Sequence, residues 1–352
     1  MQIKRIALGE IIMTVIMFSG CSTTVHNLAI VEEKTLETGK TEQESVTEKD
    51  INMNEKESFN AESNINDVIH DSAFDDYGRL IFPIDMEIKD NLKLKDVSSI
   101  LPWYSEVNTD KTVEIVNYMK NQAMNGEQIF YPIYSEEEMQ EDPDKKDTGL
   151  FFFRGNAGAK TAIINAGGGF VYVAGIHDSF PHALELSKKG HNAFALIYRP
   201  GAQTACEDLA RAIAFLHENA EQLQIDMTDY SLWGGSAGAR MAAWLGSYGT
   251  AYFGEKEYPA PAAVIMQYTG LSQVTGMEPP TYACVGTSDG IASYRSMENY
   301  ISQIQQNGPN TKIEVFKGLS HGFGLGEGTV AEGWIDRAIS FWEDNMNALD
   351  KR

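Results

Sequence analysis

The chain has 352 residues, of which 43% are hydrophobic and 10% aromatic, enough for a large packed core in one large α/β domain or two ordinary domains. Its formal net charge of −22 excludes nucleic acid as a general partner, because phosphate binding needs a basic surface, and it disfavours anionic substrates. Three cysteines (Cys21, Cys206 and Cys284) are too few for a disulfide framework or a cysteine-based zinc site.

The amino terminus has the features of a secretion signal. A basic start is followed by a 13-residue apolar run over 6–18 and by Ser-Gly-Cys at 19–21, and this run is shorter than the ~20 residues that cross a bilayer as a helix. The ending resembles a bacterial lipoprotein signal, in which Cys21 becomes the lipidated first residue, although Phe18 stands where leucine is usual. An uncleaved anchor and an ordinary signal with an unrelated cysteine are the alternatives. We predict a signal peptide at 1–21 and an exported protein on the outer face of the cell membrane, attached only through its lipid, with secretion as the alternative.

Residues 22–74 are acidic and poor in aromatic side chains. They contain 12 acidic and 4 basic residues and no Pro, Trp or Tyr. Low hydrophobicity combined with high charge does not compensate for the entropy lost on ordering, so we predict a disordered tether here. The folded domain is then expected at 75–352, with 75–149 as an N-terminal extension or a cap over a site.

From residue 150 onward, short apolar runs alternate with amphipathic segments. The runs predict strands at 150–154, 161–166, 192–198, 230–233, 262–268, 282–285 and 312–316. The other segments predict helices at 180–190, 204–223, 236–245, 293–306 and 330–348, with one earlier helix at 109–124. Strands separated by helices need crossover connections, so we predict an α/β fold with a mostly parallel central sheet and helices on both faces.

The most informative motif is Gly234-Gly235-Ser236-Ala237-Gly238, which follows a predicted strand and leads into a predicted helix. This is the context of the G-x-S-x-G nucleophile elbow, in which the serine occupies strained backbone at a tight turn. A glycine-rich turn could also hold a phosphate, but the P-loop lysine and the G-x-G-x-x-G pattern are missing here. We predict that Ser236 is a nucleophile.

A serine nucleophile needs a base and a carboxylate that orients it. Of the seven histidines, His321 lies in a glycine-rich loop after the last predicted strand, where open α/β sheets place their chemistry. Asp289 follows the preceding strand and would hold the imidazole in the correct tautomer. Glu278 is the alternative to Asp289, but it comes before that strand. Asp289 could also be a plain turn residue, since Asp-Gly favours turns.

Charge stabilisation requires N–H groups beside the serine. The glycine triplet 167–169 follows a predicted strand, and glycine lets backbone N–H groups approach a substrate oxygen closely. The N–H of Ala237, next after the nucleophile, would be their partner. The alternative is a flexible glycine loop without a role.

With these motifs, the chain from about residue 150 resembles the α/β-hydrolase fold, in particular the esterases related to hormone-sensitive lipase and bacterial acetyl esterases. The resemblance implies Ser236 as nucleophile, His321 as base, Asp289 as its orienter, and Gly168, Gly169 and Ala237 as the oxyanion hole. It implies neither a metal nor an organic cofactor. Ala166 stands where those esterases have a histidine, so the hydrogen bonds that hold the glycine loop must come from elsewhere.

The expected activity is hydrolysis of short-chain acyl esters, acetyl esters above all, carried by a small molecule or an oligosaccharide. Two other functions are considered. One is a serine peptidase of the prolyl-oligopeptidase type, which would need a larger additional domain than 75–149 can form. The other is a non-catalytic surface binding protein, against which the complete serine, histidine and aspartate set argues. Trp103, Tyr104, Tyr172 and Tyr268 are considered as a sugar-binding surface or as core residues.

Overall fold

The computed structural model describes residues 58–346. The predicted signal peptide, Cys21 and the part of the predicted tether before residue 58 lie outside the described residues. Within 58–346, none of the helices is both long and apolar enough to span a bilayer.

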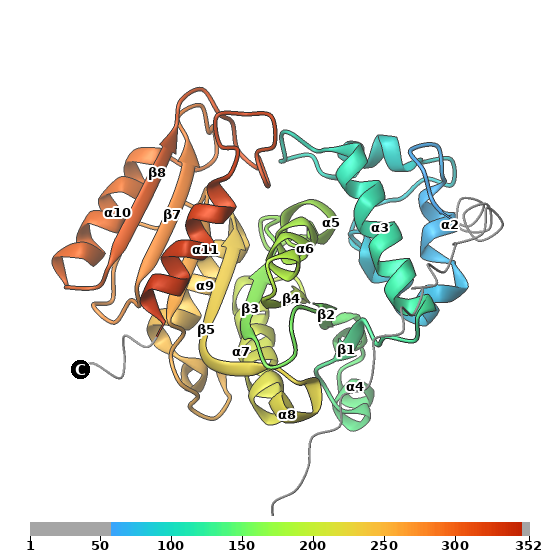
Figure 1. Cartoon of the computed structure of the whole chain (residues 1–352), viewed down its shortest axis with the longest axis horizontal. Helices are drawn as coiled ribbons and strands as arrows, with labels where there is room; N and C mark the ends of the chain where they lie inside the picture. Colours follow the sequence, from blue (N-terminus) through green and yellow to red (C-terminus); the bar gives the residue numbers. More distant parts are fainter. Residues whose placement is uncertain (1–57, 347–352) are drawn as a thin grey trace, which may run out of the picture. The chain divides into compact units, whose positions relative to one another are not determined.

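One eight-stranded sheet forms the centre of the fold (Figure 1). Its spatial order is β1-β2-β4-β3-β5-β6-β7-β8; β1, β2 and β4 pair antiparallel, and all the other pairs are parallel. The strands are β1 (Phe130–Pro132), β2 (Gly149–Phe153), β3 (Lys160–Asn165), β4 (Asn192–Ile197), β5 (Asp226–Gly235), β6 (Ala263–Gln267), β7 (Thr281–Gly286) and β8 (Thr311–Phe316). The α/β prediction is confirmed, and every predicted strand is present.

The helices occupy the segments between strands. The longer ones are α3 (Thr109–Met124), α6 (Phe180–Lys188), α7 (Ala202–Glu218), α9 (Ala237–Tyr248), α10 (Tyr294–Gln306) and α11 (Trp334–Asn345). The short ones are α2 (Ile65–Ile69), α4 (Glu136–Glu141), α5 (Gly175–Asp178) and α8 (Ala220–Leu223), together with the 3₁₀ segments η1 (Ser72–Ile81), η2 (Leu94–Ile100), η3 (Pro143–Asp147) and η4 (Thr250–Phe253).

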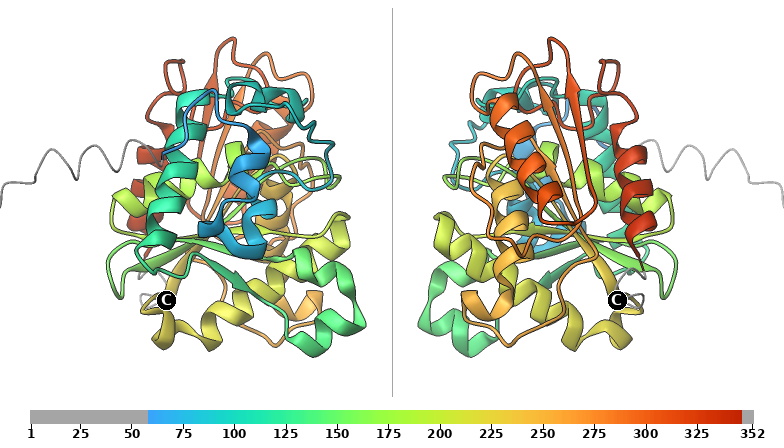
Figure 2. Two further views of the ribbon diagram at one scale, coloured as in Figure 1. Left: turned by 90° about the vertical axis from the view of Figure 1, so that its right-hand side faces the viewer. Right: turned by 90° about the vertical axis from the view of Figure 1, so that its left-hand side faces the viewer.

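The helices cover both faces of the sheet. α10 and α11 lie on opposite sides of β7 and β8 (Figure 2). α6 shares the α11 face, where the ring of His182 packs 5.6 Å from that of Trp334. α11 also packs on β5, because Trp334 and Trp342 both contact the buried Trp233. Apolar side chains on both faces explain why these strands read as continuous apolar runs in the sequence.

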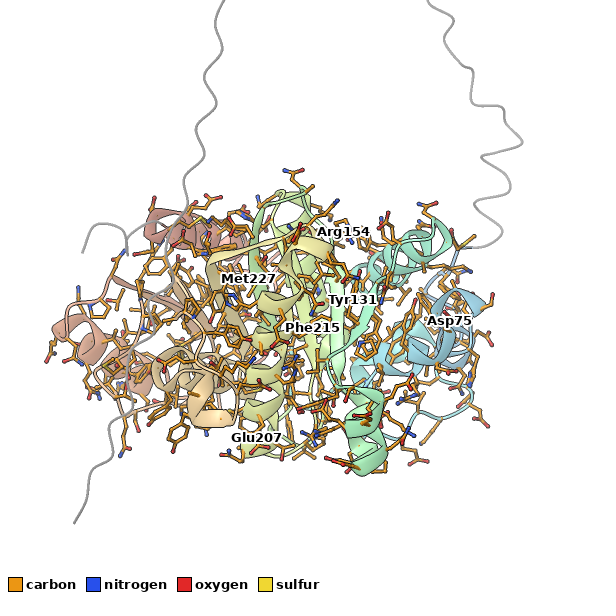
Figure 3. All side chains as sticks on the ribbon, turned by 90° about the horizontal axis from the view of Figure 1, so that it is seen from below. Asp75, Tyr131, Arg154, Glu207, Phe215 and Met227 are labelled. Atoms are coloured by element: carbon orange, nitrogen blue, oxygen red, sulfur yellow. The ribbon has the colours of Figure 1, made fainter. Side chains whose placement is uncertain are left out.

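The antiparallel strands extend one edge of the sheet. Tyr131 of β1 lies beside Phe215 of α7, with ring centroids 6.4 Å apart (Figure 3). The guanidinium of Arg154, just after β2, lies 4.3 Å over the ring of Phe152. Part of the predicted extension at 75–149 therefore belongs to the sheet itself.

The predicted boundary between tether and domain at residue 74 is wrong. Residues 58–74 are folded: Ile65, Val68 and Phe74 are buried in the same core as the sheet. Asn64 caps α2 by accepting the N–H of Asn66. The acidic composition of the whole segment hid this short apolar spacing, because three buried side chains contribute little to an average over 53 residues.

Two predicted helices have different limits. The helix expected at 204–223 is interrupted at Asn219, which separates α7 from α8. The helix expected from 330 begins only at Trp334, because Gly333 precedes it with a φ of 75° and ends a glycine-rich loop. Glycine in the left-handed region suits a break better than a helix interior.

Candidate active site

The carboxyl ends of four parallel strands bring the predicted residues to one edge of the sheet. The glycine loop follows β3, Ser236 follows β5 directly, Asp289 comes three residues after β7, and His321 five residues after β8. Parallel strands end on the same side, so loops far apart in sequence meet there.

Ser236 occupies a strained turn at the start of α9. Its φ is 51° and its ψ −113°, and its N–H donates to the carbonyl of Gln267, 3.0 Å away, at the end of β6. A Cβ at Gly238 would overlap the carbonyl of Asn165, and one at Gly234 would overlap the backbone of Gly238. Both motif glycines are therefore required because α9 begins in direct backbone contact with β3 and β5.

The three predicted side chains form a continuous hydrogen-bonded chain. Ser236 Oγ lies 3.2 Å from Nε2 of His321, and His321 Nδ1 lies 2.8 Å from Oδ2 of Asp289. The other carboxylate oxygen of Asp289 accepts the N–H groups of Ile291 (2.8 Å) and Ala292 (2.7 Å), which fixes its orientation. The side chain of Asp289 is fully buried. With Nδ1–H donating to the carboxylate, Nε2 is left to accept the serine proton.

Glu278, the alternative acid, is used elsewhere. Its carboxylate accepts the N–H groups of Thr275 and Gly276 in the turn before β7. It therefore holds a turn on the far side of that strand rather than the imidazole of His321.

The glycine loop lies against the elbow. A Cβ at Gly167 would come within 2.8 Å of the Cβ of Ser236. Gly169, Ser236 and Ala237 line one solvent-open pocket of about 200 Å³. Gly168, with a φ of 126°, does not line it but adjoins Gly169 in the same turn. The loop thus presents backbone and no side chain to the space in front of the serine.

The hydrogen bonds that hold this loop come from Asp178 and Tyr198. Asp178, at the end of α5, accepts the N–H of Gly167 at 2.6 Å, and the Tyr198 hydroxyl donates to the carbonyl of Ala166 at 2.7 Å. Asp178 also accepts the hydroxyls of Tyr104 (3.0 Å) and Tyr268. Sequence reasoning missed Asp178, although its place in a His-Asp pair ten residues after the glycine loop was visible.

Asp178 carries its charge inside the protein, directly beneath the elbow. A Cβ at Gly235 would overlap its carboxylate. Burial raises the pKa of Asp178 to about 6, and the donors Tyr268, Gly167 and Tyr104, together with the nearby His321, work against that rise. Two carboxylates therefore face this imidazole, Asp289 by direct contact and Asp178 through space.

The segment 103–105 holds the histidine loop from the other side. Ser105 donates to the carbonyl of His321 through its N–H (3.2 Å) and its hydroxyl (2.7 Å). A Cβ at Gly322 would approach Tyr104 within 2.7 Å. Part of 75–149 therefore supports the site as well as extending the sheet.

Of the aromatic residues considered for sugar binding, only Trp103 is exposed, at 42%. Tyr172 and Tyr268 are buried, Tyr104 is largely covered, and Tyr268 packs its ring 4.9 Å from that of His321. Within 58–346, no group of three or more His, Cys, Asp or Glu residues is placed to hold a metal ion.

Two buried histidines next to the site should make the fold sensitive to acid. Burial lowers the pKa of His177 to about 4 and that of His182 to about 3. A base whose pKa is lowered by folding stabilises the protein above its unfolded pKa, near 6.5, and that stability is lost as the pH falls. Asp178 acts in the opposite direction between pH 6 and 4, because the folded state holds its proton more tightly.

With two histidines opposed by one carboxyl group, we expect the free energy of unfolding to be about 3 kcal/mol lower at pH 4.5 than at pH 7. Urea titrations at the two pH values measure this difference. His177→Gln keeps a donor for the carbonyl of Gly322, 3.0 Å from the imidazole, and should reduce the pH dependence by about one proton. An unchanged dependence in that variant would exclude His177 as a cause.

Comparisons with known proteins agree with this arrangement. The acetyl ester-xyloside bifunctional hydrolase from Caldicellulosiruptor lactoaceticus superposes with a TM-score of 0.54 at 19% identity, covering 61% of this chain and 95% of that one. Esterase 2 of Thermogutta terrifontis with propionate bound gives 0.52 at 18% identity, covering 61% and 93%. The chain has an α/β-hydrolase fold. The BD-FAE family model matches residues 155–281, which contain the glycine loop and the elbow. A search of curated proteins gives no match. The predicted fold and the predicted resemblance to esterases are thereby confirmed.

Proposed function

We propose that the protein is a serine carboxylesterase that hydrolyses short acyl esters, acetyl esters above all, by way of an acyl-enzyme. The observation that carries the proposal is the chain of contacts from Ser236 through His321 to Asp289, at 3.2 and 2.8 Å. Nucleophile, base and orienting acid within hydrogen-bond distance are the groups that acyl transfer requires.

The reaction proceeds in two steps. Ser236 Oγ attacks the ester carbonyl while Nε2 of His321 takes its proton, and the oxyanion is stabilised by the N–H groups of Gly168, Gly169 and Ala237. The imidazolium then protonates the leaving alcohol, which departs and leaves an acyl-serine. Water, deprotonated by His321, attacks the acyl carbon, and the acid is released with the serine restored.

The size of the pocket supports a short acyl group. A volume of about 200 Å³ lies below the ~300–1,000 Å³ usual for pockets that hold drug-sized ligands. Phe170, Ile291 and Ala292 line it beside the serine. The fold similarity to an acetyl ester-xyloside hydrolase also supports acetyl esters as substrates, including those carried by carbohydrates.

A series of nitrophenyl esters tests the proposal. We expect the highest kcat/KM with acetate and propionate and a decline of at least about tenfold by octanoate, because longer chains exceed the pocket. Acetylated xylan fragments and aminoacyl-nitroanilides complete the panel. Turnover of anilides alone would favour a peptidase. Absence of turnover on every substrate, with no labelling of Ser236 by a fluorophosphonate, would favour a binding protein.

We also propose that the protein is exported and attached to the outer face of the membrane through a lipid on Cys21. The support is the basic, apolar and Ser-Gly-Cys pattern of residues 1–21. Cells expressing the chain should incorporate labelled fatty acid into it, and Cys21→Ser should abolish that label. Secretion without incorporation would favour an ordinary signal peptide.

A further inference from the structure

A second pocket adjoins the ester pocket. It has a volume of about 270 Å³ and shares Arg240 and Gly270 with the pocket that holds Ser236. Its other lining residues include Trp244, Tyr248 and Tyr300. Because two lining residues are common to both, the pockets form one groove, which we call the α9 groove, leading away from the serine.

One face of α9 forms the floor of this groove. Ser236, Arg240, Trp244 and Tyr248 follow one another at intervals of four residues. Side chains at this spacing lie on one face of a helix, about 6 Å further along the axis at each step. The groove therefore presents, in order from the nucleophile, a cation and then two aromatic rings.

Arg240 is a cation without a counterion in the part of the chain that the structure describes. No hydrogen bond or ion pair of its guanidinium is found within 58–346, whereas Arg79, Arg154, Arg199, Arg211 and Arg337 each pair with a carboxylate. A Cβ on Gly270 would lie 3.4 Å from Nη2 of Arg240, which places the guanidinium where the two pockets meet. The carboxylate in the second pocket, Glu278, already accepts two backbone N–H groups.

An unpaired arginine is unusual in a chain with a net charge of −22, which offers many carboxylates as partners. Partly buried beside a nucleophile, its planar fork is suited to bind a carboxylate in two-point geometry. The negative charge of the whole chain disfavours anionic substrates in general, so binding of one requires a local cation of this kind.

The rings beyond Arg240 are arranged in stacked pairs. Phe170 stacks on Trp244 with centroids 6.2 Å apart and planes 7° apart, and Tyr248 stacks on Tyr252 at 4.9 Å. Tyr248 is 46% exposed and Tyr252 66%. Phe170 is held with a φ of 62°, a backbone conformation that a bulky residue rarely adopts. Rigid, partly exposed ring faces suit the flat apolar faces of sugar rings.

We propose that the α9 groove binds the sugar chain of an acidic carbohydrate ester, with Arg240 paired to a carboxylate of the sugar next to the scissile ester and Trp244 and Tyr248 stacked on the sugars that follow. The proposal deepens the proposed esterase function and rests on it. It names a substrate class: acylated oligosaccharides that contain uronic acid.

The test compares two acetylated substrates of equal length, an oligomer of galacturonic acid and a neutral xylo-oligosaccharide. We expect the wild type to prefer the acidic oligomer in kcat/KM, and Arg240→Gln to lower the ratio of acidic to neutral at least about tenfold. Arg240→Lys should retain part of the preference, since it keeps the charge but loses the fork. Arg295→Gln is the matched control, because it removes an equal charge from an exposed site on α10 and should leave the ratio unchanged.

A binding measurement separates this proposal from the esterase function. In the Ser236→Ala background, calorimetry with unacetylated oligogalacturonate should show binding that Arg240→Gln weakens about tenfold. Tyr248→Ala should remove the gain in affinity with increasing oligomer length. An equal ratio in wild type and Arg240→Gln, or equal binding with and without Arg240, overturns the proposal. Binding that depends on Arg240 without hydrolysis of any ester would support the groove and reject the esterase.

Discussion

Replacing Ser236 with alanine is expected to lower kcat for nitrophenyl acetate by about 10⁴-fold or more. The hydroxyl 3.2 Å from Nε2 of His321 is the proposed nucleophile, and without it only the oxyanion hole and substrate binding remain. The melting temperature should change little, because alanine keeps the Cβ and removes one hydrogen bond at a partly exposed position. Wild-type turnover in this variant would mean that another group is the nucleophile.

Ser236→Gly is the matched variant that separates chemistry from strain. It removes the same hydroxyl, so its activity should be as low as that of Ser236→Ala. A φ of 51° with a ψ of −113° costs a residue with a side chain of order 1–3 kcal/mol, and glycine adopts it freely. After allowance for the greater freedom of glycine in the unfolded chain, we expect Ser236→Gly to be about 1 kcal/mol more stable than Ser236→Ala.

Differential scanning calorimetry of the two variants measures this difference, which corresponds to roughly 2 °C in melting temperature. A Ser236→Gly variant that melts below Ser236→Ala would show that the turn stores no strain. In that case the strict need for Gly234 and Gly238 would be purely a matter of backbone contact.

The elements of the sheet could be predicted because their signals are local. Runs such as 161–166 are apolar throughout, which follows from burial on both faces, and the elbow is five consecutive residues. Asp289 and His321 could be proposed because each follows a strand, and parallel strands end at the same edge of the sheet.

The supporting residues could not be predicted because their roles depend on contacts far apart in the chain. Ser105 holds the carbonyl of His321 across 216 residues, and Tyr268 reaches Asp178 across 90. Nothing in the sequence around position 178 distinguishes a buried acceptor from a surface carboxylate. The absence of a histidine at Ala166 did indicate that some other group must hold the glycine loop, but not which one.

Asp178 is the residue whose replacement should cost the most among those outside the serine, histidine and aspartate set. Asp178→Ala would leave the N–H of Gly167 and the hydroxyls of Tyr104 and Tyr268 buried without their acceptor. Unpaired buried donors and the resulting cavity should together lower the free energy of unfolding by roughly 3–5 kcal/mol. Urea titration measures this loss, and Asp336→Asn, at an exposed position on α11, is the control for a change in charge.

Asp178→Asn keeps the shape and tests the charge. The amide can accept on one side only, so its NH₂ group faces donors on the other, and the glycine loop shifts away from its position beside Ser236. The imidazolium that forms on His321 during catalysis also loses the through-space attraction of a buried carboxylate. We expect kcat to fall by about 10- to 100-fold with a smaller change in KM, because both effects act where charge develops in the transition state.

The pH profile distinguishes these effects from a merely structural defect. Burial raises the pKa of Asp178 to about 6, so the wild-type carboxyl group is charged above that pH and neutral below it. The ratio of wild-type to Asp178→Asn activity should therefore be largest at pH 7–8 and should decrease as the pH falls through 6, where the wild type loses the same charge. A ratio that stays constant from pH 8 to pH 5 would show that Asp178 acts only by holding the loop, and that its charge does not contribute to catalysis.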